Sequence, residues 1–167
     1  PVGDPSDPDT ELGALISPEH RDKVAGYVAL AREEGGQVLT GGMPPALDAP
    51  FDQGAFFEAT VIGGLAHDSR TATEEIFGPV LCVVRVNSLE EAMQLINDHE
   101  YGNGTAIFTR DGDAARDFAN RINVGMVGVN VPIPVPLAYH TFGGWKKSVF
   151  GDLNQHGPDA FKFYTRT

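Results

Sequence analysis

The sequence predicts an α/β fold in which a mainly parallel sheet is flanked by helices. Segments with apolar residues at helical spacing alternate with short β-branched runs. Residues 105–130 are the clearest case because they read as strand, helix and strand, and the right-handed crossover of such a unit requires a parallel pair. A chain of 167 residues can bury one ordinary core. We find no interior boundary and predict a single domain over residues 1–167, opened by an extended leader at residues 1–16.

A helix and two strands are predicted after the leader. Ser17 supplies an N-cap hydroxyl and Pro18 suits the first helical position, so a helix is expected to begin there. The pair Gly35-Gly36 is typical of a helix end. Strands are predicted over residues 37–40 and 55–62.

The stretch TATEEIFGPVLCVVRV, residues 71–86, organises the rest of the chain. Thr71 lies three residues before Glu74, which is the capping-box spacing and predicts a short helix that opens at Thr71. Pro79 ends any such helix because it lacks the backbone donor. The β-branched run at residues 80–84 predicts a buried strand.

Two further helices and two strands are predicted in the second half. Ser88 is followed by capping-box spacing and predicts a helix start. Asp111 or Asp113 is expected to cap the next helix, which ends at Gly125. Strands are predicted over residues 105–109 and 126–130.

The charge and cysteine content exclude some classes of function. The net charge is −11, so the mean field repels phosphate backbones and anionic membranes, and we expect neither nucleic acid nor a membrane as partner. No stretch has the length and apolarity of a membrane span. A single cysteine, Cys82, leaves no disulfide framework and fits a reducing compartment, so we expect a cytoplasmic protein.

Few residues suit direct catalysis. Cys82 lies in the apolar run LCVVRV, where a free cysteine behaves as a small hydrophobe, so we interpret it as structural and not as a nucleophile. The five histidines lack ligand spacing, and no metal site is predicted. Neither a P-loop nor a dinucleotide fingerprint occurs, so most of any NAD-binding surface would lie outside this chain.

One carboxylate of the pair Glu74-Glu75 and the ring of Phe77 are the candidate ligand-binding groups. They lie in EEIFGP, residues 74–79, just before the predicted strand, where α/β proteins tend to place ligands. An ionised carboxylate can accept hydrogen bonds from both hydroxyls of a vicinal diol. The alternative is a surface helix start, where the helix dipole favours acidic residues.

The segment EEIFGP resembles a motif of the aldehyde dehydrogenase family. The resemblance implies that Glu75 holds the ribose hydroxyls at the nicotinamide end of NAD and that Phe77 lies beside that ribose and ring. A second segment, FGGWKKS at residues 142–148, is similar to the family's FGGxKxS element. It implies that Phe142 lines the aldehyde tunnel, while Gly143-Gly144 allow a sharp turn. The residues alone also allow a plain surface loop here.

The end of the chain points to one branch of that family. Most members have glycine, arginine and glutamate after the serine of the second motif, whereas this chain continues Val149-Phe150-Gly151. This departure, with the segments NVPIPVP and FKFYTR, resembles the methylmalonate-semialdehyde dehydrogenase branch. The resemblance implies oxidation of (methyl)malonate-semialdehyde-type substrates, with NAD as cofactor and coenzyme A as the co-substrate that receives the acyl group.

The resemblance also implies that parts of the enzyme lie outside the chain. The family's nucleophilic cysteine, general-base glutamate and NAD domain lie upstream of the counterpart of Pro1. We therefore expect a fragment from the C-terminal part of the catalytic domain, inactive alone, with no catalytic residue of its own. Its expected partners are the aldehyde, the rest of the enzyme chain or a homo-oligomer. Two alternatives stay open: a non-catalytic self-associating or partner-binding module, and an independent small-ligand binder anchored by Glu75.

Overall fold

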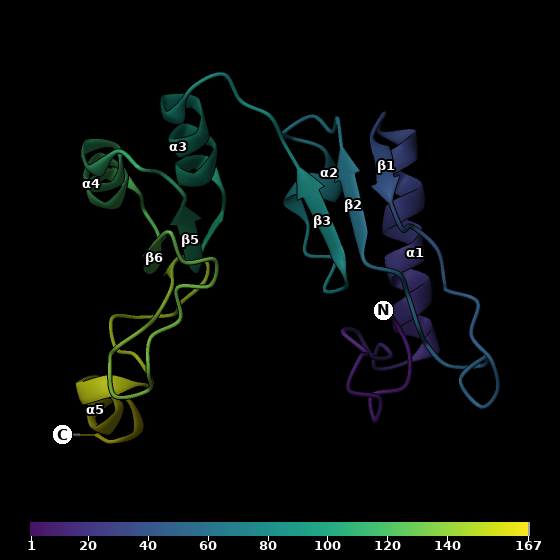
Figure 1. Cartoon of the computed structure of the whole chain (residues 1–167). Helices are drawn as coiled ribbons and strands as arrows, with labels where there is room; N and C mark the ends of the chain where they lie inside the picture. Colours follow the sequence, from purple (N-terminus) through teal and green to yellow (C-terminus); the bar gives the residue numbers. More distant parts are fainter. Residues whose placement is uncertain (167) are drawn as a thin grey trace. The chain divides into compact units, whose positions relative to one another are not determined.

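The computed structural model describes residues 1–166 and shows two compact units, which meet in the sequence between Arg85 and Val86 (Figure 1). Each unit has its own helices and short strands and is described by itself. The single domain over residues 1–167 stays a prediction. Among the described residues, no helix is both long and apolar enough to cross a membrane.

The leader, residues 1–16, is bent where the sequence predicted an extended segment. Val2 and Leu12 form an isolated bridge, so the chain folds back on itself. The carboxylates of Asp4 and Asp7 each accept the backbone N–H two residues later, at 2.8 and 2.9 Å. Such local bonds from aspartate favour turns, which explains the bend.

Helix α1 (Pro18–Glu33) begins and ends where the sequence predicted. The hydroxyl of Ser17 accepts the backbone N–H of His20 at 3.2 Å, which satisfies one of the free donors of the first turn. After the helix, Gly35 has a φ of +86°, a conformation that favours glycine.

The strands of the first unit form a mixed three-stranded sheet. Strands β1 (Gln37–Thr40) and β2 (Thr60–Gly63) pair antiparallel, whereas β2 and β3 (Val80–Val83) pair in parallel. The strand predicted over residues 55–62 begins only at Thr60. Residues 55–57 bury their side chains in the core without joining the sheet. Their apolar pattern, which predicted a strand, reflects this burial and not strand pairing.

Helix α1 packs its apolar stripe against this sheet (Figure 1). The buried cluster combines side chains from the helix, the sheet and the connecting loops: Val24, Val28, Ala31, Phe57, Ile62, Leu65 and Ile76. Leu39 of β1 and Leu81 of β3 are both 62% exposed. The strand predicted at residues 80–84 therefore exists as β3, but the prediction that it is buried is wrong: Leu81 is exposed and the other residues are half-buried, because successive strand residues face opposite sides.

The short helix α2 (Arg70–Thr73) exists, but its predicted start is wrong. Ser69 is the N-cap, and its hydroxyl accepts the backbone N–H of Ala72 at 3.3 Å. The hydroxyl of Thr71 instead donates to Glu34 at 2.7 Å, which leaves it buried and unable to cap. Glu74 then stands at the end of the helix and not at its third position.

The second unit confirms the predicted strand, helix and strand order. Strand β5 (Gly104–Ile107) pairs in parallel with β6 (Met126–Val129), and α4 (Gly112–Arg121) connects them. Asp111 caps α4, since its carboxylate accepts two backbone N–H groups at 2.8 and 3.2 Å. The core beneath this crossover comprises Met93, Phe118, Ile122 and Val124.

Helix α3 (Leu89–Asp98) begins at the predicted cap, and the hydroxyl of Ser88 accepts the N–H of Glu91 at 3.1 Å. The α/β fold class is confirmed. The described strands fall into three small sheets and not one mainly parallel sheet, and both units contain a parallel pair. The remaining elements are β4 (Tyr101–Gly102), β7 (Trp145–Lys146), the short 3-10 helix Gly157–Asp159 and α5 (Ala160–Tyr164).

Candidate cofactor-binding loop

The loop formed by residues 74–79 leaves α2 and enters β3, and it places one buried side chain between exposed ones. Ile76 is buried in the cluster beneath α1. Phe77 is 75% exposed and has a φ of +59°. This left-handed conformation costs an L-residue about 1–2 kcal/mol. A Cβ on Gly78 would lie 2.5 Å from a methyl carbon of Val24, so only glycine lets the loop approach the helix this closely.

The two adjacent glutamates of the loop have different surroundings. Glu74 accepts a hydrogen bond from the hydroxyl of Tyr27 at 2.8 Å and forms an ion pair with Arg70, also at 2.8 Å. The bonds from Arg70, and then that from Tyr27, hold the pKa of the Glu74 carboxyl below its ordinary value. The Glu74 carboxylate is thus already engaged within the fold.

Glu75 is exposed, and no side chain among residues 1–166 donates a hydrogen bond or forms an ion pair with its carboxylate. Its side chain and that of Phe77 line a shallow pocket of about 300 Å³, together with residues of α2 and β3. A carboxylate with free acceptor oxygens beside an exposed ring fits a ligand with a vicinal diol next to a flat ring. The nicotinamide riboside end of NAD has this form.

Helix α1 contributes residues that the sequence reasoning missed. Nε2 of His20 lies 2.6 Å from the carbonyl oxygen of Phe77, and Nζ of Lys23 lies 3.5 Å from that of Glu75. The sequence assigns His20 no role beyond the absence of metal-ligand spacing among the histidines. The available signal was the spacing of His20, Lys23 and Tyr27, which places three polar side chains on one face of the helix.

The second motif has a different geometry. The ring of Phe142 is half-buried and stacks on that of His156, with centroids 4.2 Å apart and planes 11° from parallel. Its role in an aldehyde tunnel stays a prediction. The sharp turn predicted at Gly143-Gly144 lies instead around Lys146, which has a φ of +55°. Gly144 is needed for close approach, since a Cβ there would lie 2.3 Å from that of Ser148.

Lys146 and Ser148 of this motif serve the local structure. The ammonium of Lys146 donates to the carbonyls of Ile96 and His99 at 2.8 and 2.9 Å, which satisfies the C-terminal end of α3. The hydroxyl of Ser148 accepts the backbone N–H of Gly102 at 3.0 Å. These bonds attach the motif to α3 and β4.

Cys82 has the surroundings of a structural cysteine. It is half-buried against the core, and its thiol donates to the carbonyl of Thr71 at 3.5 Å. Burial raises the pKa of the Cys82 thiol, which disfavours the reactive thiolate. Residues 1–166 contain no cluster of three or more histidine, cysteine or acidic side chains that could hold a metal.

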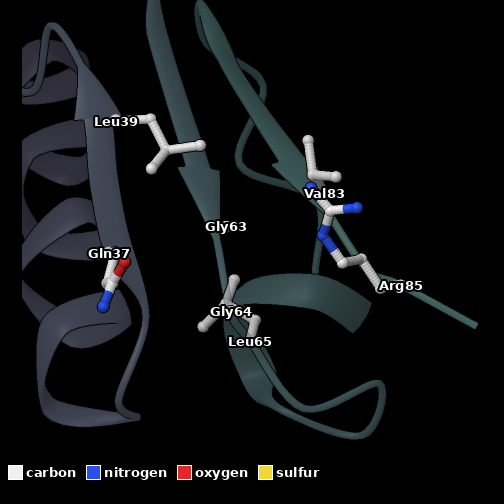
Figure 2. A pocket seen from close by; sticks show the side chains of 7 residues that line it. All are labelled: Gln37, Leu39, Gly63, Gly64, Leu65, Val83 and Arg85. Carbon is white, nitrogen blue, oxygen red and sulfur yellow. The ribbon is translucent and has the colours of Figure 1, made fainter.

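A second pocket, of about 360 Å³, lies over the ends of the three strands of the first unit (Figure 2). It shares no lining residue with the pocket at Glu75. Leu39 and Val83 provide apolar walls, and Arg85 is the one charged side chain that lines it. The cofactor prediction therefore concerns the first pocket alone.

The chain matches known proteins along its whole length. The model of the aldehyde dehydrogenase family matches residues 1–167. Malonate-semialdehyde dehydrogenase of Pseudomonas aeruginosa is 55% identical over 93% of this chain and 31% of its own length. Malonate-semialdehyde dehydrogenase 1 of Geobacillus kaustophilus is 41% identical over 99% of this chain and 33% of its own. The chain thus spans about a third of the length of these relatives.

Solved structures give the same result. Methylmalonate-semialdehyde dehydrogenase from Oceanimonas doudoroffii is 49% identical, with a TM-score of 0.93, over 99% of this chain and 34% of that one. Betaine aldehyde dehydrogenase from Staphylococcus aureus in complex with NAD⁺ is 38% identical, with a TM-score of 0.89, over 98% of this chain and 32% of that one. This chain belongs to the aldehyde dehydrogenase family.

Proposed function

We propose that this chain holds the nicotinamide end of NAD in a semialdehyde dehydrogenase. The observation that carries the proposal is the contrast between Glu74, whose carboxylate is engaged by Arg70 and Tyr27, and Glu75, whose carboxylate has no partner among residues 1–166. The Glu75 oxygens would accept hydrogen bonds from both ribose hydroxyls, and the exposed ring of Phe77 would flank the ribose and nicotinamide.

The chain's contribution to the reaction is orientation. Bound NAD supplies the hydride acceptor. Glu75 and Phe77 hold the acceptor ring in one place, which is a proximity effect and requires no proton transfer from these residues. Phe142 would line the aldehyde pocket with its apolar ring. We assign neither the nucleophile nor the general base of the reaction to a residue of this chain.

The proposal extends to the substrate, the acyl acceptor and the protein partners. The relatives named malonate-semialdehyde and methylmalonate-semialdehyde dehydrogenase support a (methyl)malonate-semialdehyde-type substrate. Coenzyme A as acyl acceptor and a homo-oligomer or the rest of an enzyme chain as protein partner follow from the resemblance of the segments NVPIPVP and FKFYTR. The single cysteine supports a cytoplasmic location.

A hybrid enzyme tests this function. The chain would replace the matching third of the Pseudomonas aeruginosa relative, and NADH formation would be followed with malonate semialdehyde and coenzyme A. We expect the folded hybrid to form NADH and the isolated 167-residue chain to form none. A folded, NAD-binding hybrid that oxidises no aldehyde would contradict the proposal, as would NADH formation by the isolated chain.

A second candidate is a non-catalytic module that associates with itself or with a partner. The exposed leucines of β1 and β3 favour it, because apolar side chains on an uncovered sheet face invite association. Analytical ultracentrifugation separates the two candidates. A concentration-dependent dimer without NADH formation in the hybrid would support the module, whereas a monomer at all concentrations would argue against it.

A further inference from the structure

We propose that His20 is a positioning residue that holds the peptide between Phe77 and Gly78, and through it the Phe77 ring, in the orientation that receives the cofactor. The inference deepens the proposed function and rests on it for the cofactor. The conformational part concerns the first unit alone and can be measured without any ligand.

The contact at His20 is short and chemically defined. Nε2 lies 2.6 Å from the carbonyl oxygen of Phe77. Because a carbonyl oxygen only accepts, Nε2 must carry the proton and donate. The two rings also meet edge to face, with centroids 6.2 Å apart at 71°. One side chain thus contacts both the backbone and the ring of Phe77.

Phe77 needs such a contact because its backbone conformation is rare for an L-residue. Its φ is +59°, and such a conformation persists only where the surroundings enforce it. Buried Ile76 fixes the chain before Phe77, and the close approach of Gly78 to Val24 fixes it afterwards. Neither contact holds the carbonyl of Phe77. The bond from His20 does, so it opposes rotation of that peptide to the ordinary extended region.

Neighbouring side chains on the same helix face secure the rest of the loop. Lys23 reaches the carbonyl of Glu75 and Tyr27 reaches the carboxylate of Glu74. The three helix residues lie at i, i+3 and i+7 and therefore form one stripe. The side chains of this stripe form hydrogen bonds to the backbone of the loop and to the carboxylate of Glu74. They leave the carboxylate of Glu75 and most of the Phe77 ring exposed.

The direct test is nuclear magnetic resonance of the isotopically labelled chain. Backbone couplings and carbon shifts of Phe77 distinguish positive from negative φ. We expect H20A to shift Phe77 toward negative φ, H20Q to keep the native values because its amide can still donate, and H67A, an exposed histidine outside the loop, to change nothing. Urea titrations report whether each variant is folded. Native Phe77 signals in folded H20A would overturn the proposal, and so would failure of H20Q to restore them.

The same variants in the hybrid enzyme test the link to the cofactor. A lost positioning bond should raise KM for NAD about tenfold in H20A, with kcat reduced less, while H20Q stays within about twofold of the parent. An unchanged KM for NAD in H20A would overturn that link. A parent hybrid that binds NAD but oxidises no aldehyde would instead refute the proposed function, and the resonance measurement would still decide the role of His20.

Discussion

The loop at residues 74–79 and the segment at residues 142–148 both match family motifs, yet they differ in what their side chains do. In the first, the helix α1 stripe holds the backbone, and the Glu75 and Phe77 side chains remain exposed. In the second, Phe142 stacks on His156 and the motif's lysine caps α3. The charged side chain of Lys146 is thus engaged within the fold, whereas the carboxylate of Glu75 has no partner among residues 1–166.

The largest expected effect comes from the anchor of the first loop. Ile76 is 7% exposed and lies in the core cluster, so I76A should lower the free energy of unfolding by about 2–4 kcal/mol through lost burial and a cavity. L81A is the matched control, because Leu81 is 62% exposed and should cost far less. Urea denaturation measures both variants, and equal losses would mean that the loop is not anchored through Ile76.

The lysine of the second motif should have an intermediate effect. K146M removes two hydrogen bonds to the end of α3 and should destabilise the second unit by about 1–3 kcal/mol. The control K147M removes only an exposed ion pair with Glu100, which contributes little. Thermal unfolding followed by circular dichroism compares them. A more harmful K147M would show that Lys146 does not secure this motif.

Acid should weaken the first unit partly through Glu74. The bonds from Arg70 and Tyr27 lower the pKa of this carboxyl in the folded state, so folding is favoured above its ordinary pKa of 4.5 and the contribution is lost as pH falls through the folded value. The melting temperature of E74Q should be below that of the parent at pH 7. The two should converge only once the pH has fallen below the lowered pKa of the folded state, and a difference that persists after Glu74 is protonated in both states would contradict this origin.

The sequence predicted the elements better than their roles. Ser17, Ser88 and Asp111 identified helix starts correctly because a cap is a local bond. Thr71 failed because its hydroxyl is taken by Glu34, which lies far away in sequence. The contact of His20 with Phe77 spans 57 residues, so the polar stripe of α1 is visible in the sequence but the loop that it contacts is not.

The pair of glutamates also shows where local reasoning ends. Adjacent and chemically identical, they could be told apart from sequence only by resemblance to the family motif. The structure supplies the physical distinction, since Arg70 and Tyr27 both reach Glu74. The sites of ligand contact stay predictions.

The most direct measurement compares E75Q with E74Q in the hybrid dehydrogenase. An amide has a single acceptor oxygen, so E75Q should lose one of the two bonds to the ribose and raise KM for NAD about tenfold or more, with an unchanged melting temperature. E74Q should lower the melting temperature and change KM for NAD much less. If E75Q left KM for NAD unchanged while E74Q raised it, Glu75 would not be the residue that holds the cofactor.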